Sequence, residues 1–173
     1  GDAAIVDLQS VAAADTGTSA DMALVATHLR RKAYDAALKA IDGLEKKLAG
    51  QPMPAHLRGQ VLMAKKDAAG ARVAFEQAVT RDPKYFPSVA ALAGLDYLDK
   101  KPDAARGRFE ALLKLDPKHA PARLALAELA ARSGAKREAV TALLEEAVKV
   151  SPTDQSLRVA LIDHHVGGGD YKA

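Results

Sequence analysis

The sequence predicts an all-α fold, a right-handed α-solenoid in which about ten helices form tandem antiparallel pairs. The first observation is an internal repeat: the segment ARVAFEQAVTRDP, residues 71–83, returns as ARGRFEALLKLDP, residues 105–117. The second is that apolar residues inside each period stand three or four apart, the spacing of one helix face. The third is composition, since 49% of the residues are hydrophobic but only 4% are aromatic. Small side chains suit closely packed helices, whereas strands favour β-branched and aromatic residues.

When the sequence is aligned with itself at an offset of 34 residues (105 − 71), similar residues fall into two columns. The small column is Ala37, Ala71, Ala105 and Ala139, and the large column, at the fourth position after each, is Ile41, Phe75, Phe109 and Leu143. The pair Asp82-Pro83 returns as Asp116-Pro117 and, one position late, as Ser151-Pro152. The extra residue predicts a bulge near Leu144 or a shift in the turn that follows that helix.

Each period holds two predicted helices. Proline-containing turns end the second helix of a pair, because proline lacks an N–H and clashes with the preceding turn. Breaks within a period are predicted at Lys66-Asp67, Lys100-Pro102 and Gly134-Ala135, with Asp67 as an N-cap. The chain, 1–173, is therefore predicted to be one array taken from a longer one. Its predicted segments are a second helix (3–17), four complete repeats (18–51, 52–85, 86–119 and 120–154) and the first helix of a truncated repeat (155–173).

The two ends of this array are predicted to leave apolar surface uncovered, because a repeat array needs polar caps. The residues concerned are Ile5, Leu8, Leu161, Ile162 and His165. We therefore expect the ends to stack on another molecule, most simply a second copy of the chain, so self-association is a predicted property.

Composition argues against several functional classes. The net charge is only +3, and 25 Lys and Arg residues are interspersed with 22 Asp and Glu residues, so no basic face for nucleic acid is predicted. No apolar run approaches the roughly 20 residues of a membrane span, and none is predicted. There is no cysteine.

The side chains suggest neither an enzyme nor a cofactor-binding protein. His164 and His165 are adjacent, so they point about 100° apart on a helix and cannot chelate together as an i, i+4 pair would. No metal site, cofactor site or catalytic set of residues is therefore predicted.

The period, the two columns and the Asp-Pro turns together resemble the tetratricopeptide repeat. The resemblance covers nearly the whole chain. Three departures stand out: no repeat has the family's Trp, Arg58 stands where Leu is usual, and Asp96 stands where an aromatic residue is usual. The resemblance implies a scaffold that binds proteins or peptides without catalysis.

A narrower resemblance runs from Leu57 to Ala130, through LRGQVLMAKKDAAGARVAFEQAV and DPKYFPSVAALAGLDYLDKKPDAARGRFEALLKLDPKHAPARLALAELA. This stretch resembles the tetratricopeptide lipoproteins of the PEP-CTERM and exosortase system, which are associated with bacterial exopolysaccharide loci. That resemblance implies a protein of the bacterial cell envelope, most simply in the periplasm, and leaves the cytoplasm open. The lipid-bearing Cys of that group has no counterpart in this chain.

The tetratricopeptide resemblance also implies where a partner binds, since first helices line a concave groove in such arrays. The residues predicted to face it are Met22, Ala26, Leu29, Arg30, His56, Gln60, Met63, Ala90, Gly94, Tyr97, Leu124, Glu128, Arg132, Val159 and Asp163. Met adapts to varied partners and Tyr97 offers an amphipathic anchor. The alternative is that Met63 and Tyr97 only pack against neighbouring first helices.

Arg58 and Asp96 each place a charge where the repeat normally buries an apolar group. A buried charge needs a partner. We predict a structural ion pair between them across a repeat boundary, with Arg72 or Arg106 as alternative partners of Asp96.

Three functions are compatible with these patterns. The first is a non-catalytic interaction scaffold with a protein or peptide ligand, acting in envelope protein sorting or assembly. The second is a carbohydrate-associated module of an exopolysaccharide export complex, which exposed aromatic residues along the groove would favour. The third is an enzyme, for which no set of catalytic residues is present.

Overall fold

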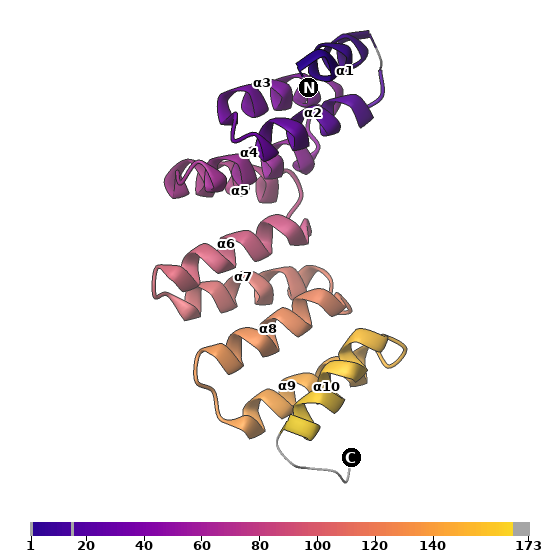
Figure 1. Cartoon of the computed structure of the whole chain (residues 1–173). Coiled ribbons are helices and arrows are strands. Elements are labelled where there is room, and N and C mark those ends of the chain that lie inside the picture. Colours follow the sequence, from indigo (N-terminus) through magenta and orange to yellow (C-terminus); the bar gives the residue numbers. More distant parts are fainter. Residues whose placement is uncertain (1, 15, 168–173) are drawn as a thin grey trace. The chain divides into compact units, whose positions relative to one another are not determined.

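A computed structural model describes residues 2–14 and 16–167, and all regular structure in those residues is helical (Figure 1). The helices are α1 (Asp2–Ala14), α2 (Ser19–Arg30), α3 (Tyr34–Lys47), α4 (Pro52–Ala64), α5 (Ala68–Arg81), α6 (Phe86–Leu98), α7 (Pro102–Leu115), α8 (Ala120–Arg132), α9 (Arg137–Val150) and α10 (Gln155–Gly167). The predicted all-α fold class is confirmed. Residue 15 of the predicted segment 3–17 and residues 168–173 of the predicted segment 155–173 lie outside the described residues.

The chain divides into two compact units, Gly1–Ser88 and Val89–Ala173, with the boundary inside α6. In the first unit, each helix from α1 to α4 packs on the next helix in the chain. In the second unit, α8 packs on α7, α9 and α10. The predicted segments 18–51, 52–85, 86–119 and 120–154 hold one helix pair each. That these pairs form one uninterrupted array stays a prediction.

The turn inside each helix pair has the same backbone conformation four times. Lys32, Lys66, Lys100 and Gly134 all have positive φ, between 56° and 79°. In the second pair, the Asp67 N–H donates to the Leu62 carbonyl at 2.9 Å, and this bond around a left-handed residue is a Schellman cap. The Asp67 carboxylate then accepts from the Gly70 N–H at 2.8 Å, which confirms Asp67 as an N-cap.

The turn between successive pairs also recurs. Tyr85 N–H donates to the Asp82 carbonyl at 3.0 Å, and His119 N–H donates to the Asp116 carbonyl at 3.1 Å. Asp154 N–H does the same to Ser151 at 3.1 Å. The Asp-Pro and Ser-Pro sequences therefore produce one type of turn three times. Proline stops the helix, and the carbonyl of the Asp or Ser before it accepts a hydrogen bond from the N–H three positions later.

The core is built on the two sequence columns through the first three repeats. Ala37, Ala71 and Ala105 have no exposed surface, and the large residues four positions later are buried as well. A column of alanines lets neighbouring helices approach to the short end of the usual spacing, about 8–10 Å. The larger side chains then fill the space beside the alanines.

The columns change register in α9. Val140 and Leu144 are buried there, whereas Ala139 is exposed and Leu143 is only half-buried. The cause is the length of the preceding turn: the turns at 31–33, 65–67 and 99–101 are alike in length, but the α8–α9 turn, 133–136, is longer by one position. The prediction of a bulge near Leu144 or of a shift in the later turn is therefore wrong. The extra residue is Ala135, between the left-handed Gly134 and the helix start.

Gly59 and Gly107 offer a matched pair of substitutions. A Cβ added at Gly59 would lie 2.4 Å from the Phe75 ring, whereas one added at Gly107 would meet nothing within 4 Å. We expect Gly59→Ala to lower the free energy of unfolding by about 1–3 kcal/mol through overpacking. Gly107→Ala should raise it by about 0.5–1 kcal/mol through helix propensity. Urea denaturation measures both. Equal effects of the two variants would contradict the close packing of α4 on α5.

Candidate functional site

The predicted inward-facing residues of the first unit are mostly on the surface. Met22 is 36% exposed and Met63 is 37% exposed, and Ala26, Arg30 and Gln60 are exposed too. Leu29 is half-buried and packs against the core around Val25 and Ile41. Both methionines are therefore accessible to a partner, and their role in binding stays a prediction.

The predicted inward-facing residues of the second unit divide in the same way. Gly94, Glu128, Arg132, Val159 and Asp163 are exposed, and Ala90 is half-buried. Leu124 packs into the core beside Ala120, Ala147 and Leu157. The Tyr97 hydroxyl donates to the Arg132 carbonyl at 3.0 Å, so part of its polar capacity serves to join α6 to α8.

His56 is the predicted surface residue that the structure buries. Its side chain is 8% exposed, and its Nδ1 lies 2.9 Å from the Ser88 Oγ. The rings of Phe75 and Tyr85 lie 5.4 and 5.6 Å from the imidazole, centre to centre. Burial lowers the pKa of His56 from its usual 6.5, because the charged form loses its hydration. The prediction that His56 faces a groove is therefore wrong, and the residue is part of the core.

Arg58 and Asp96 each have a partner within their own unit, and neither partner was predicted. The Arg58 guanidinium binds Asp42 of α3 at 2.7 Å, and Arg58 is only half-buried because its long side chain reaches the surface. Asp96 is 5% exposed and binds the Arg108 guanidinium of α7. Arg106, the predicted alternative, instead lies between Asp103 and Glu110. A direct Arg58–Asp96 pair would join the two units and stays a prediction.

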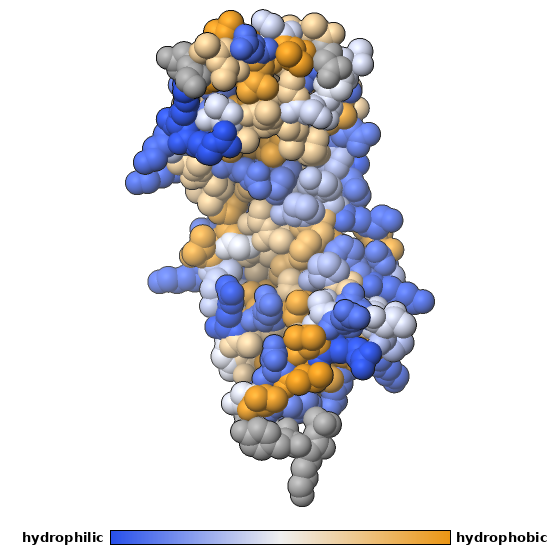
Figure 2. Space-filling model, turned by 45° about the vertical axis from the view of Figure 1, so that its right-hand side comes forward, coloured by the Kyte–Doolittle hydropathy of each residue, from blue (hydrophilic) through white to orange (hydrophobic). Residues whose placement is uncertain are grey.

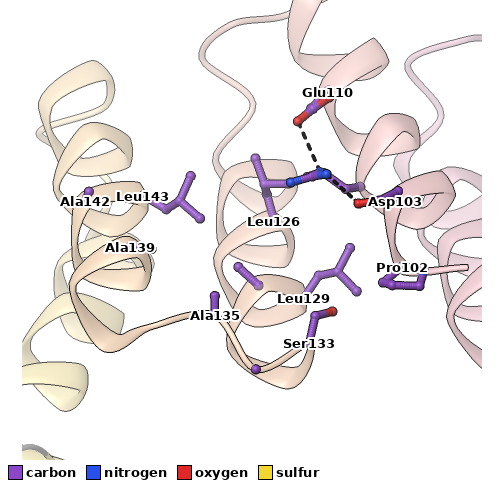
Figure 3. A pocket seen from close by; sticks show the side chains of 13 residues that line it. Pro102, Asp103, Glu110, Leu126, Leu129, Ser133, Ala135, Ala139, Ala142 and Leu143 are labelled. Carbon is purple, nitrogen blue, oxygen red and sulfur yellow. Dashed lines mark hydrogen bonds and ion pairs between the residues drawn. The ribbon is translucent and has the colours of Figure 1, made fainter. Parts of the chain in front are cut away.

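A groove of about 710 Å³ lies among α7, α8 and α9 in the second unit. Its floor is formed by Leu126, Leu129 and Ala130 of α8, and Ala142 and Leu143 of α9 form one wall (Figure 3). These leucines are half-buried, whereas Leu92, which holds the place of Leu126 in the preceding repeat, has no exposed surface. The volume falls within the range typical of ligand sites, roughly 300–1,000 Å³.

The opposite wall of the groove is charged. Arg106 lies between two carboxylates of α7, with 2.5 Å to Asp103 and 3.8 Å to Glu110, and dashed lines in Figure 3 mark these ion pairs. All three side chains are more than half exposed. Two carboxylates and one guanidinium leave this wall with a net charge of about −1 at neutral pH.

Two residues that line the groove, Ala130 and Leu143, stand where the preceding repeat has an ion pair. Asp96 corresponds to Ala130 in the next repeat, and Arg108 corresponds to Leu143 once the additional residue Ala135 is counted. In the preceding repeat the Asp96–Arg108 ion pair fills the space between α6 and α7. Alanine and leucine are shorter and uncharged, so they fill less of the corresponding space, and both line the groove.

None of the predicted inward-facing residues lines this groove. Successive residues of a helix are rotated by about 100°, so Leu126 and Ala130 lie nearly opposite Glu128 on α8, and Leu129 lies roughly a quarter turn from it. The sequence contains one signal, the late return of the Ser-Pro turn, but the column alignment pairs Leu143 with Phe109 and places it in the core. Alignment with Arg108 instead shows an apolar residue in place of a charged one.

The described residues contain no cluster of three or more His, Cys, Asp or Glu side chains suited to a metal ion. Among the same residues, no helix has both the length and the apolar character that a membrane crossing requires.

Residues 89–155 match the family model of the tetratricopeptide repeat. No curated protein matches the chain in sequence. Among solved structures, the fold is similar to a thermophilic tetratricopeptide protein of Thermus thermophilus, with a TM-score of 0.64 and 20% identity over 95% of this chain and 90% of that one. MamA of Desulfovibrio magneticus RS-1 is similar with a TM-score of 0.55 and 21% sequence identity, over 88% of this chain and 85% of that one.

A third similar structure is YrrB, described as a tetratricopeptide protein with an unusual peptide-binding site. It gives a TM-score of 0.58 and 16% identity over 93% of this chain and 86% of that one. At these sequence identities, the similarity of the three structures to this chain shows a shared fold alone.

His56 predicts a pH-dependent stability. Because its folded-state pKa is lowered, the unfolded chain binds the proton more readily as the pH falls through 6.5. The free energy of unfolding should therefore decrease between pH 6.5 and the lower folded-state pKa, and should be restored as the pH rises. Chemical denaturation on both sides of this window measures the slope. His56→Gln should flatten it, and an unchanged slope would assign the effect to other groups.

The origin of the groove predicts a double-mutant cycle. Ala130→Asp alone places an unpaired carboxylate in a half-buried position and should cost about 1–3 kcal/mol. Adding Leu143→Arg recreates the pair of the preceding repeat, and we expect a favourable coupling of about 0.5–3 kcal/mol. Denaturation of the wild type, both single variants and the double variant measures the coupling. Strict additivity would contradict the equivalence of the two sites.

Proposed function

We propose that this chain, whose residues 89–155 match the tetratricopeptide-repeat model and whose fold is similar to that of tetratricopeptide proteins, is a non-catalytic scaffold that binds a protein or peptide. Function belongs to a site and does not follow from a fold alone. The proposal therefore depends on a surface of this chain that can receive a partner.

The observation that carries the proposal is the groove among α7, α8 and α9. Soluble proteins normally bury leucines such as Leu126 and Leu129, and leaving them half-exposed beside an open volume of about 710 Å³ forfeits part of their hydrophobic stabilisation. Concave apolar surface with a charged rim is typical of binding sites. YrrB, which is similar in fold, is described as having a peptide-binding site, and this supports the same class of ligand here.

The predicted inward-facing residues of each unit are the second candidate. Met63 is the most suitable anchor in the first unit, because an exposed Met adapts its shape to varied partners, and the half-buried Tyr97 is the most suitable anchor in the second.

The biological setting that we propose is the bacterial cell envelope, most simply the periplasm, with a role in exopolysaccharide-associated protein sorting or assembly. Its support is the sequence resemblance of residues 57–130 to the tetratricopeptide proteins of the exosortase system. A carbohydrate-associated module of an export complex is the alternative. Among the residues on the proposed surfaces only Tyr97 is aromatic, and its hydroxyl already binds Arg132, so the protein ligand is better supported.

Self-association is also part of the proposal. Helix α10 buries Leu157 against α8 and α9 but exposes Val159, Ile162 and Val166, which follow one another at intervals of three and four positions. Figure 2 shows orange, apolar surface near the lower end of the molecule, at the height of α10 in Figure 1. A helix with apolar residues on two sides commonly packs on both, so a second copy is a suitable partner.

A pull-down from envelope extract tests the proposed function with four baits, the first of which is the wild type. Ala142→Trp fills the groove from α9, and Ala131→Trp adds the same bulk at an exposed position of α8 outside the groove. We expect the wild type and Ala131→Trp to recover the same defined partner and Ala142→Trp to lose it. A fourth bait, Met63→Ala with Tyr97→Ala, tests the inward-facing surface.

If Ala142→Trp recovers the partner and the Met63→Ala, Tyr97→Ala bait does not, the binding surface is the inward-facing one. If no bait recovers a stoichiometric partner, the scaffold function is contradicted.

A further inference from the structure

We propose that the groove among α7, α8 and α9 receives an amphipathic α-helix of a partner protein, with a stripe of bulky aliphatic residues flanked by Lys or Arg. This inference rests on the proposed scaffold function and specifies the chemistry of its ligand. Three properties of the groove lead to it: the state of its backbone groups, the size of its wall residues, and the charge of its rim.

Along most of its length the groove offers few partners to a peptide backbone. Its walls and floor are the helices α7, α8 and α9, whose interior N–H and C=O groups are already bonded along each helix, and the non-helical part of its lining is the α8–α9 turn at one end. The polar side chains that line it are Asp103, Arg106, Glu110 and Ser133, and Arg106 is already engaged by two carboxylates. An extended peptide would lose hydration from its backbone without replacement bonds. A helix satisfies its own backbone and can present only side chains to the groove.

The wall residues suit large aliphatic side chains. Three alanines, Ala130, Ala139 and Ala142, line the groove together with Leu126 and Leu143. Elsewhere in this chain a large side chain packs directly on a small residue: the Phe75 ring lies 2.4 Å from the position that a Cβ on Gly59 would take. Leucine or isoleucine at positions i, i+3 or i+4, and i+7 of a helix would fill the spaces above these alanines in the same manner.

The rim selects the charge beside that stripe. The α7 wall holds Asp103 and Glu110 around the single guanidinium of Arg106. A basic residue at the edge of the incoming helix would meet an excess of carboxylate, whereas an acidic one would be repelled. Because these groups are exposed, the preference is modest and sensitive to salt.

Binding of labelled synthetic peptides of about 18 residues, a length of five helical turns, tests this inference by fluorescence anisotropy. The first peptide has Leu at i, i+4, i+7 and i+11 with Lys at the flanking positions. The second has the same composition with the Leu residues distributed around the helix, and the third has a central Pro. The fourth replaces the flanking Lys by Glu.

We expect the first peptide to bind the wild type and Ala131→Trp equally, and to bind Ala142→Trp at least about tenfold more weakly. The redistributed and Pro-containing peptides should also bind about tenfold more weakly than the first. The Glu peptide should be about two- to fivefold weaker than the Lys peptide at low salt. This last difference should disappear at high salt. At low salt it should reverse in the Asp103→Asn, Glu110→Gln variant, because Arg106 then leaves the wall with a net charge of about +1.

Equal binding of the Pro-containing peptide would overturn the helical ligand. Concentration-dependent self-association that Ala142→Trp abolishes would overturn it as well, because a second copy would then occupy the groove. Neither outcome would contradict the scaffold function, which fails separately if the pull-down recovers no partner. A Lys peptide that binds wild type and Ala142→Trp alike would remove the groove as the binding site.

Discussion

Helices in this protein approach one another through alanines that have no exposed surface, and the remaining packing depends on that approach. Ala37, Ala71 and Ala105 remove side-chain bulk from one line of each second helix. Large residues one turn later then fill the space between neighbouring helices, as Phe75 does against Gly59. The consequence is a seam that tolerates neither a larger residue in the small column nor a smaller one in the large column.

Equivalent positions along this seam carry different side chains in successive repeats. Between α6 and α7 the Asp96–Arg108 pair fills the volume beside the alanine column. At the equivalent positions between α8 and α9, Ala130 and Leu143 leave that volume empty. A single additional residue, Ala135, determines which side chains of α9 meet the seam. A candidate binding surface therefore arises from local substitutions and one turn, without any change in the order of the helices.

The two candidate surfaces of α8 make different demands on the fold. The predicted inward-facing side, which includes Glu128 and Arg132, is polar and exposed, and it requires little of the core. The groove side keeps Leu126 and Leu129 only half-buried, so its hydrophobic stabilisation is incomplete until a ligand covers it. Binding there would stabilise the second unit as well as capture the partner. The charged α7 wall keeps this open apolar surface hydrated at its edge in the absence of a ligand.

Periodicity along the chain determined the helices, their pairing and the buried alanine column, because helix formation and the internal repeat depend on residues close in sequence. The turns at Lys66 and Lys100 are predicted as breaks, but their left-handed geometry is not, since lysine carries no signal for positive φ. Only the tertiary structure decided that Arg58 binds Asp42, that Asp96 binds Arg108 and that His56 is buried. It alone showed the groove, because an open volume depends on which side chains meet across a seam. Which side chains contact one another across the seam is set by packing between helices, and the spacing of residues within one helix does not reveal it.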